Sequence, residues 1–235
     1  MSQAALEERI VKLEQVNERL RHGIARAQAY IEIHNLASRY QYYHQPLTMK
    51  KTFELFAQST PGVSVGISAG IDDGIERVRA FWTKDSSIPI EGVMLEHHLT
   101  TPLIEVAGDA QSAKAVFMSP GHETVPGLLP GGHWVWGRYA MDFVNENGVW
   151  KILRVFFYPT FRTRVDRDWT EGPEPPSPEL AAHREHNPFS RPMPYANLYT
   201  KNGVREMVPV PPEPYETFET YDPTGGAQGA NRSDE

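Results

Sequence analysis

Apolar residues recur at helical spacing from residue 4 to about residue 45. The first series steps by alternating intervals of four and three residues, with Asn17 where another apolar residue would sit, and comprises Leu6, Ile10, Leu13, Leu20 and Ile24. Such spacing predicts a helix whose apolar seam serves oligomerisation or docking, or else lies on its own domain. Gly23 leaves open a division into two helices. Pro46 ends the helix because proline disfavours helical geometry in the residue before it.

Beyond Pro46 the pattern predicts two shorter helices and a run of strands. The helices cover residues 47–58 and 71–85, and Asp72 or Asp73 is expected to cap the second. Strand patterns occupy residues 63–68, 92–106, 110–120 and 133–161. Within these, "NENG" and "AGDAQS" predict turns between antiparallel strands, because Asn and Gly accept the positive φ of tight turns. Helices followed by long strands predict an α+β fold with one curved antiparallel sheet covered by helices.

The composition changes after Trp169. Twelve of the 20 prolines lie between Pro173 and Pro223, yet this stretch also carries aromatic segments that free linkers usually lack. We therefore predict an extension that wraps over its own domain or over a neighbouring subunit. The chain is expected to divide into a docking or oligomerisation helix, an α+β barrel domain, the wrapping extension and a disordered end, at residues 1–27, 28–168, 169–223 and 224–235.

Charge and composition exclude several classes of function. The sequence has 23 basic and 30 acidic residues and a net charge of -7, so it lacks the basic stripe with which nucleic-acid-binding proteins neutralise phosphates. The absence of cysteine excludes disulfides, thiolate metal sites and a cysteine nucleophile. The N-terminal segment is too charged for a signal peptide, and no apolar run is long enough for a membrane span. We expect a cytoplasmic protein without nucleic-acid or membrane partners.

Two adjacent histidines lie near the start of the segment "EHHLTTPLIEVAGD", which otherwise has the composition of a strand. Successive strand residues point to opposite faces, so Glu96 and His98 share one face while His97 and Leu99 share the other. A carboxylate on the same face can orient the His98 imidazole as a base for proton abstraction. The alternative is that His97 packs under a helix and His98 faces solvent. Which histidine faces the interior stays open on this pattern alone.

The end of the long predicted helix is rich in tyrosine and histidine. Tyr40, Tyr43 and His44 lie within about one helical turn, so Tyr40 can share a face with either of the others. A tyrosine hydroxyl in an apolar cavity can protonate a leaving hydroxyl or stabilise a phenolate or enolate oxygen. The competing interpretation is an aromatic core, which we adopt for Tyr42.

Metal and nucleotide sites find little support in the sequence. The histidines include the closely spaced His183 and His186 and, near a glycine-rich loop, His122 and His133, but no HExxH or comparable ligand framework is present. The stretch "GLLPGG" contains no lysine and does not precede a predicted helix, so it does not match a phosphate-binding loop. We therefore expect neither a metal nor another cofactor.

The segments "HNLASRYQYYH", "GIDDGIERVRAFW", "HHLTTPLIEVAGDAQSAKAVF" and "GRYAMDFVNENGVWKI", taken in this order, follow a familiar pattern. It resembles the SnoaL-like branch of the nuclear transport factor 2-like superfamily over roughly residues 28 to 162. The resemblance implies helices that close one end of a cone-shaped half-barrel sheet around a deep cavity. That superfamily hosts dehydratases, isomerases, cyclases, lyases and binding modules, so the resemblance does not fix a reaction.

Relatives of the scytalone dehydratase and bile-acid dehydratase types work without a cofactor, and the resemblance to them implies site residues. It places the catalytic histidine at His98, or at His97 after a slip of one residue, and the helical tyrosine at Tyr40 or Tyr43. Where those relatives carry an aspartate and a second histidine, this sequence departs from the pattern with His44, Gln45 and Trp136.

The strand that contains Trp136 supplies candidate substrate contacts. Alternation divides it into one face with Trp134, Trp136, Arg138 and Asp142 and another with His133, Val135, Tyr139 and Met141. Because relatives face the cavity at Trp136, we expect the tryptophan face to hold an aromatic ring, with Arg138 neutralising an anionic group. The alternative is that Arg138 pairs with Asp142 or Glu96. The closing strand adds two aromatic candidates, Phe156 and Tyr158.

The aromatic extension and the "RYQYYH" helix also resemble the cofactorless lyase of lignin-derived diarylpropanes, which releases formaldehyde from a phenolic diol. We therefore predict a cofactor-independent lyase that acts on a small phenolic aromatic by general acid–base elimination and, more narrowly, releases formaldehyde. Two alternatives stay open: a dehydratase or isomerase of a hydroxy-aromatic, polyketide or steroid, and a non-catalytic binding module. The N-terminal seam and the extension favour a homodimer or homotrimer over a monomer.

Overall fold

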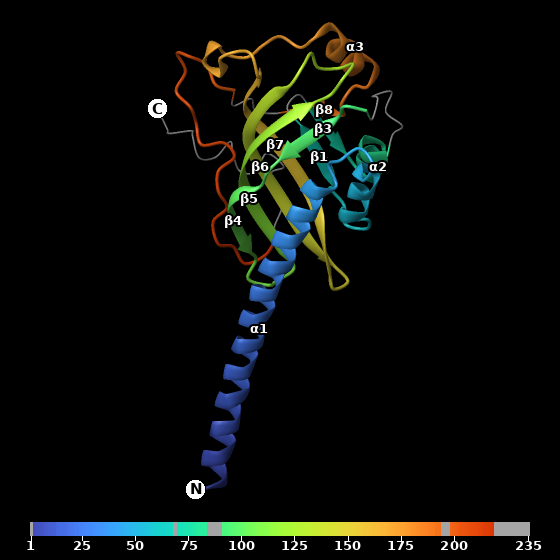
Figure 1. The fold of residues 1–235 in the computed structure, drawn as a ribbon. Helices are drawn as coiled ribbons and strands as arrows, with labels where there is room; N and C mark the ends of the chain where they lie inside the picture. Colours follow the sequence, from blue (N-terminus) through green and yellow to red (C-terminus); the bar gives the residue numbers. More distant parts are fainter. Residues whose placement is uncertain (1, 68–69, 84–90, 194–197, 219–235) are drawn as a thin grey trace.

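The computed structural model describes residues 2–67, 70–83, 91–193 and 198–218. A long helix leads into a curled sheet, whose inner face carries the helices and whose outer face carries the C-terminal segment (Figure 1). This architecture confirms the predicted α+β class with a half-barrel sheet under N-terminal helices. The predicted disordered end at residues 224–235 lies outside the described residues.

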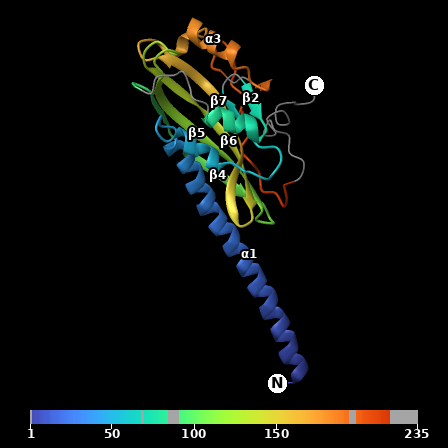
Figure 2. The ribbon, with the colours of Figure 1, turned by 90° about the vertical axis from the view of Figure 1, so that its right-hand side faces the viewer.

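Helix α1 spans Gln3–Tyr42 without a break, so Gly23 does not divide it. Its last third packs on the inner face of the sheet, and its N-terminal end lies far from the sheet (Figures 1 and 2). The residues that make this packing are Ala29, Ile33, Ala37 and Tyr40. Tyr42 lies about 200° around the helix from Tyr40 and is exposed, so its predicted place in the core is wrong.

Two short helices follow, the 3-10 helix η1 at Met49–Leu55 and α2 at Ile75–Thr83. Helix α2 begins later than predicted because the preceding residues, Gly70–Asp73, form strand β2. Asp72 pairs with Arg77 on the helix itself. Asp73 pairs with Arg191 of the C-terminal segment, so both predicted caps bind arginines instead.

The described residues form one sheet of eight strands. Their bounds are β1 Ser64–Ile67, β2 Gly70–Asp73, β3 Met94–His97, β4 Thr100–Val106, β5 Ser112–Thr124, β6 His133–Glu146, β7 Val149–Arg164 and β8 Arg191–Pro192. The order is β3-β5-β6-β7-β1-β2-β8, and β4 pairs with β5 beside β3. Strands β1 and β7 run parallel, whereas the other pairs are antiparallel. A parallel pair needs a long connection, and here the chain between β1 and β7 forms strands β2 to β6 and helix α2.

The predicted hairpin at "NENG" is confirmed. Asn147 and Gly148 adopt φ of 54° and 86°, and the Gly148 N–H donates to Asn145 Oδ1 at 2.7 Å. By contrast, the strand predicted over residues 92–106 is interrupted after His97, and the register shifts between Thr100 and Leu103. The interruption makes His97 the last residue of β3.

The two faces of the sheet bury different sets of side chains. On the inner face, one core cluster joins the end of α1 to alternate residues of β5, β6 and β7, namely Ala113, Ala115, Phe117, Val135, Tyr139, Met141, Phe143, Val155 and Phe157. On the outer face a smaller cluster joins the sheet to the C-terminal segment through Ile71, Phe156, Tyr158, Val208 and Met193. The inner face is therefore the one that the helices enclose.

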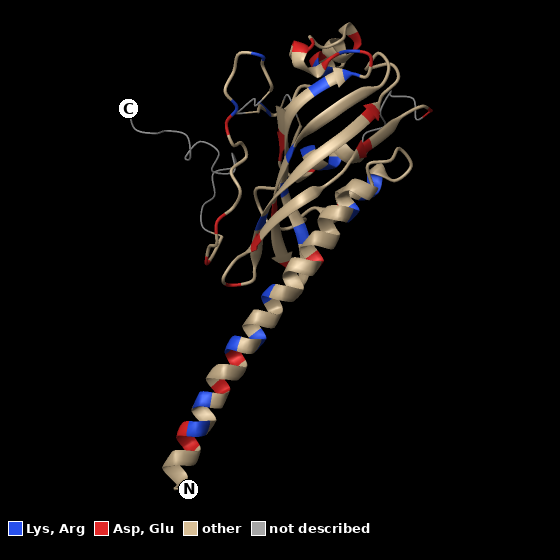
Figure 3. Ribbon diagram, turned by 60° about the vertical axis from the view of Figure 1, so that its left-hand side comes forward, with Lys and Arg blue, Asp and Glu red and all other residues tan. Residues whose placement is uncertain are grey.

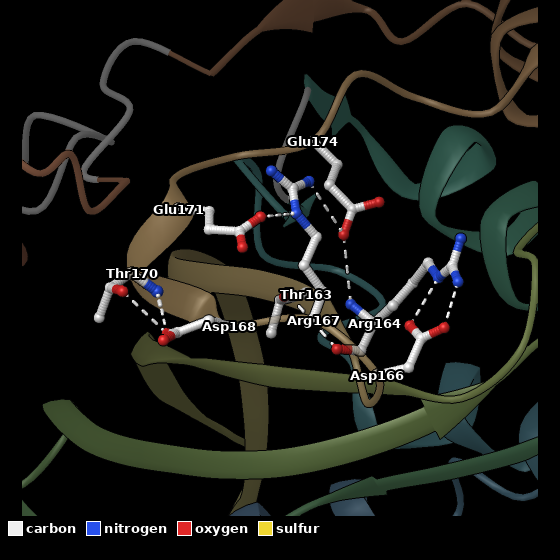
Figure 4. Close-up of polar contacts among 8 residues, drawn as sticks. All are labelled: Thr163, Arg164, Asp166, Arg167, Asp168, Thr170, Glu171 and Glu174. Atoms are coloured by element: carbon white, nitrogen blue, oxygen red, sulfur yellow. Dashed lines mark hydrogen bonds and ion pairs between the residues drawn. The ribbon is translucent and has the colours of Figure 1, made fainter.

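The C-terminal extension wraps its own domain. It contains η2 at Trp169–Glu171 and α3 at Pro178–His186 before β8 joins the sheet edge. Figure 4 shows how it begins, with the Arg167 guanidinium between the carboxylates of Glu171 and Glu174. Farther along, the backbone N–H groups of Gly108 and Asp109 donate to the carbonyls of Tyr215 and Glu216 at 2.8 and 2.9 Å.

Candidate active site

His97 lies on the inner face of the sheet, opposite Gly121 of β5. A Cβ at Gly121 would lie 2.9 Å from His97 Cδ2, and a Cβ at Gly137 would lie 2.6 Å from the Phe157 ring. Glycine at these two positions therefore leaves room for both rings to lie across the strands. The rings of His97 and Phe157 stack there with centroids 6.2 Å apart and planes inclined by 6°.

A buried carboxylate lies beside His97. Glu123 lies two residues after Gly121 on β5, on the same inner face of the sheet as His97, and is 3% exposed. Its Oε2 is 3.4 Å from His97 Nε2, a distance at which the interaction is mainly electrostatic. Its Oε1 accepts from the Arg162 guanidinium. Burial by itself raises the pKa of Glu123, but His97 and Arg162 together lower that pKa below its ordinary value. The ionised carboxylate can stabilise a positive charge on the His97 imidazole.

The end of α1 places a second histidine near the first. The rings of His44 and His97 are 6.1 Å apart, and Trp82 of α2 lies 5.2 Å from His44. Nδ1 of His44 lies 2.8 Å from the Tyr40 carbonyl oxygen, which can only accept, so Nδ1 carries the hydrogen. Burial and the nearby His97 lower the pKa of His44 to about 4, partly opposed by that hydrogen bond. At neutral pH the ring is uncharged, and Nε2 carries the lone pair.

Two tyrosine hydroxyls complete the acid–base groups. The rings of Tyr40 and Tyr139 are 6.2 Å apart, and both side chains are buried. Burial raises the pKa of each hydroxyl above its ordinary value. The nearby Tyr139 raises the pKa of Tyr40 further, whereas a hydrogen bond with the Gln41 side chain partly offsets the raised pKa of Tyr139. Both hydroxyls stay protonated at neutral pH and can donate.

Several buried polar atoms here have no hydrogen-bond partner among the described residues. They are both ring nitrogens of His97 and the indole nitrogen of Trp82. Buried polar groups are nearly always paired, and leaving one unpaired costs about 1–3 kcal/mol. Such a concentration of unpaired groups suits a site that binds a polar ligand. We call the following residues the His97 cluster: Tyr40, Gln41, His44, Trp82, His97, Glu123, Tyr139, Phe157 and Arg162.

A model of the SnoaL-like domain matches residues 25–155, which is more than half of the chain. The chain belongs to the SnoaL-like domain family. This finding confirms the resemblance at the level of the SnoaL-like family. No protein of curated function matches the sequence at a significant level.

Solved structures with the same SnoaL-like fold include proteins named for elimination reactions. A scytalone dehydratase candidate from Novosphingobium aromaticivorans DSM 12444 is 15% identical, with a TM-score of 0.50, over 62% of this chain and 99% of that one. The dehydrochlorinase LinA is 11% identical, with a TM-score of 0.51, over 66% of this chain and 99% of its own. LinA-type3 from Novosphingobium barchaimii LL02 has 12% identity, a TM-score of 0.50 and the same coverage. At these identities the likeness establishes the fold alone.

The SnoaL-like chain separates its two adjacent histidines. His98 is exposed, and the centroid of its ring lies 6.5 Å from that of His122, away from the His97 cluster. Glu96, the expected partner of His98, instead accepts a hydrogen bond from Gln45 at 3.1 Å. The expected geometry for a Glu96–His98 base is therefore wrong, because β3 ends at His97 and turns only that ring inward. Of the helical candidates, Tyr40 and His44 join the cluster, while Tyr43 is partly buried against the inner core.

The tryptophan face of β6 points away from the cluster, so its expected role in lining the cavity is wrong. Trp134 and Trp136 are 46% and 47% exposed, and Trp136 stacks on Phe161. Arg138 donates to the Val208 carbonyl of the C-terminal segment. The cause is that the opposite face of β6 is the more continuously apolar one and joins the helical core. Phe156 and Tyr158 of β7 were also expected to line the cavity, but they lie in the outer cluster, because they alternate with Val155 and Phe157, which face inward.

Sequence reasoning missed six members of the cluster: Gln41, Trp82, Glu123, Tyr139, Phe157 and Arg162. One signal was available for Glu123. The alternation of buried residues along β5, at Ala113, Ala115 and Phe117, continues to residue 123 if the strand is extended past Pro120. Pro120 had marked the expected end of that strand, but the strand pairs with β3 and β6 beyond it.

Other parts of the described chain are weaker candidates for a functional site than the His97 cluster. A surface hollow of about 530 Å³ adjoins Gln15 and His22 of α1, and one of about 340 Å³ separates β5 and β6 from the extension at Pro211. Neither is lined by a residue of the His97 cluster. Within the described ranges no group of three or more His, Asp or Glu side chains is placed to hold a metal ion. No helix in those ranges is long and apolar enough to cross a membrane.

We expect His44 to make the fold sensitive to acid. Its folded pKa of about 4 lies below the value of about 6.5 for an unfolded histidine, so the unfolded state binds the proton more readily between these values. Stability that is present above pH 6.5 is therefore lost as the pH falls through 4, by about 3 kcal/mol in full. Asp142 opposes this trend, since burial raises its pKa to about 6 despite the charges of Arg154 and Lys114.

A comparison of the wild-type protein with His44→Gln isolates the contribution of His44 to the pH dependence of stability, because Asp142 is present in both proteins. Urea unfolding at pH 7 and pH 4.5 should show that the wild-type protein loses about 2–3 kcal/mol more between the two pH values than the variant. An equal loss in both proteins would show that His44 does not carry the acid sensitivity.

Proposed function

We propose that the chain is a cofactor-independent lyase that performs general acid–base elimination on a small phenolic substrate. The observation that supports it most is the state of His97. Its side chain is 12% exposed and lies beside an ionised Glu123–Arg162 pair, its ring nitrogens have no hydrogen-bond partner among the described residues, and it faces His44. A base held in this way fits proton abstraction. The fold is shared with proteins named as a dehydratase and as dehydrochlorinases.

In the proposed reaction His97 accepts the proton of the substrate's phenol. Electrons from the phenolate then move through the ring and break the bond between a para benzylic carbon and its hydroxyl group. Tyr40 or Tyr139 donates a proton to the departing hydroxyl, which leaves as water, and a quinone methide remains. Glu123 stabilises the His97 imidazolium formed in the first step. Phe157 and Trp82 supply aromatic walls for the substrate ring.

The narrower form of this proposal is formaldehyde release from a lignin-derived diarylpropane diol, as the resemblance to that lyase implies. After water leaves, the uncharged His44 removes the proton of the neighbouring hydroxymethyl group. The carbon–carbon bond breaks, formaldehyde departs, and the electron pair forms the new alkene and restores the phenolate. His97 returns its proton to the phenolate, and the proton taken up by His44 returns to the tyrosinate. The diol thus becomes an alkenyl phenol, water and formaldehyde without any oxidant or reductant.

The test uses purified, chelator-treated protein and a panel of phenolic diarylpropane diols and phenolic carbinols, with products followed by mass spectrometry. We expect loss of water, or of water and formaldehyde, from the free phenols. The matched phenol methyl ethers should not react, because they cannot form the quinone methide. A product of unchanged mass would indicate an isomerase instead. Binding of the panel without turnover would reject the lyase and favour a binding module.

A further inference from the structure

The N-terminal half of α1 has an apolar surface that no other described residue covers. Every residue from Ser2 to Ala25 is exposed, and the segment projects from the sheet (Figures 1 and 2). Its leucines and isoleucines are exposed too, for example Leu13 at 58% and Ile24 at 57%. Helices in proteins gain most of their stability from packing an apolar face. Among the residues that the structure describes, this segment therefore lacks the apolar contact that would stabilise it.

The exposed apolar residues follow a heptad repeat. The a positions are Ile10, Asn17, Ile24 and Ile31, and the d positions are Leu6, Leu13, Leu20 and Ala27. A β-branched residue at a with leucine at d favours two parallel strands over three or four. A single asparagine at an a position fixes register and oligomeric state, because its amide is paired only when it meets the same residue of an in-register partner.

Charge and position agree with a second copy as the partner. In a parallel pair, Arg9 at a g position faces Glu14 at the next e position of the other helix, so the flanking contact is attractive in both directions. Acidic and basic residues are interspersed from Glu7 to Arg19, and two further arginines, Arg21 and Arg26, follow (Figure 3). The seam also points away from the sheet, since Ile31 is 60% exposed while Ala29 and Ile33 are buried. A second helix can thus reach the whole seam without displacing the domain.

We propose that residues 6–31 of α1 pair in parallel and in register with the same residues of a second copy of the chain. The two-stranded coiled coil makes the protein a dimer and brings the two Asn17 side chains together. This inference does not depend on the proposed reaction.

The first test is disulfide cross-linking, which is unambiguous because the chain has no cysteine of its own. Leu6→Cys places one thiol near the end of the seam, where a parallel in-register dimer brings it against its own counterpart. An antiparallel pair would separate the two thiols by tens of ångströms, at about 1.5 Å per residue. Under oxidising conditions we expect Leu6→Cys to form a covalent dimer. Val11→Cys, also on an exposed apolar position but off the seam, should not.

The second test is the mass in solution, by light scattering after gel filtration. The wild-type chain should be a dimer, and the double variant Leu13→Glu/Leu20→Glu should dissociate with a dimerisation Kd raised at least about tenfold. Val11→Glu is the matched control and should stay dimeric. An unchanged thermal transition of the sheet domain in each variant shows that the domain is still folded. A monomeric or trimeric wild type, a dimer that Leu6→Cys fails to cross-link, or a double variant that remains dimeric would each overturn the proposal.

Discussion

His97→Gln is expected to reduce turnover of the reactive phenol by about 100- to 10,000-fold, the usual contribution of a positioned general base. The amide of glutamine can occupy much of the same space but cannot accept and hold a proton near neutral pH. Because Gly121 and Phe157 hold the imidazole in place, little of the loss should come from misfolding. The measurement is kcat on the substrate identified in the phenol panel, with the unfolding transition of the variant recorded beside it.

The neighbouring His98→Gln variant is the matched control. His98 is exposed and lies near His122 on the other side of the strand, so turnover should stay at the wild-type level. If His98→Gln were the inactive variant, the base would lie outside the His97 cluster and the site would have to be placed elsewhere. If both variants turned over normally, neither histidine would be the base.

The parts of the fold that sequence predicted well depend on local patterns. Helix α1 follows from regular apolar spacing, and the hairpin between β6 and β7 follows from the turn residues Asn147 and Gly148. Strand β2 was misread as the start of a helix because two aspartates before Gly74 have the local character of a helix cap. Its strand conformation depends on pairing with β1 and β8, which are distant contacts that no local pattern reports.

The candidate site was predictable only in part, for a similar reason. Alternation showed that His97 and His98 point to opposite faces, but the inner face is defined by the pairing of β3 with Gly121. The tryptophans of β6 were placed inward because the resemblance suggested it. The sequence contained a contrary sign, since the face with Val135 and Tyr139 is the more apolar. That the C-terminal extension contacts the outer face could not be read from its prolines.

Glu123→Gln is expected to lower both stability and turnover. The substitution removes the charge that pairs with Arg162 and His97 while keeping the size of the side chain. Hydrogen bonds to charged groups contribute about 1.5–3 kcal/mol, and the Arg162 side chain is 32% exposed, so water limits the loss of stability to about 2 kcal/mol. Because the folded pKa of Glu123 is lowered, its contribution is present above pH 4.5 and is lost as the pH falls. Urea unfolding at pH 7 measures the difference.

The loss of turnover should be about 10- to 100-fold, since the His97 imidazolium formed during the reaction loses its countercharge and each 1.36 kcal/mol changes a rate tenfold. Glu96→Gln is the matched control, because it neutralises a carboxylate on the adjacent strand that accepts from Gln45 and not from His97. A Glu123→Gln protein that is less stable but keeps its kcat would reduce Glu123 to a structural partner of Arg162. A fall in kcat that Glu96→Gln does not share would instead assign the Glu123 carboxylate to the proton transfer, since the two substitutions remove the same charge from neighbouring strands and only Glu123 contacts His97.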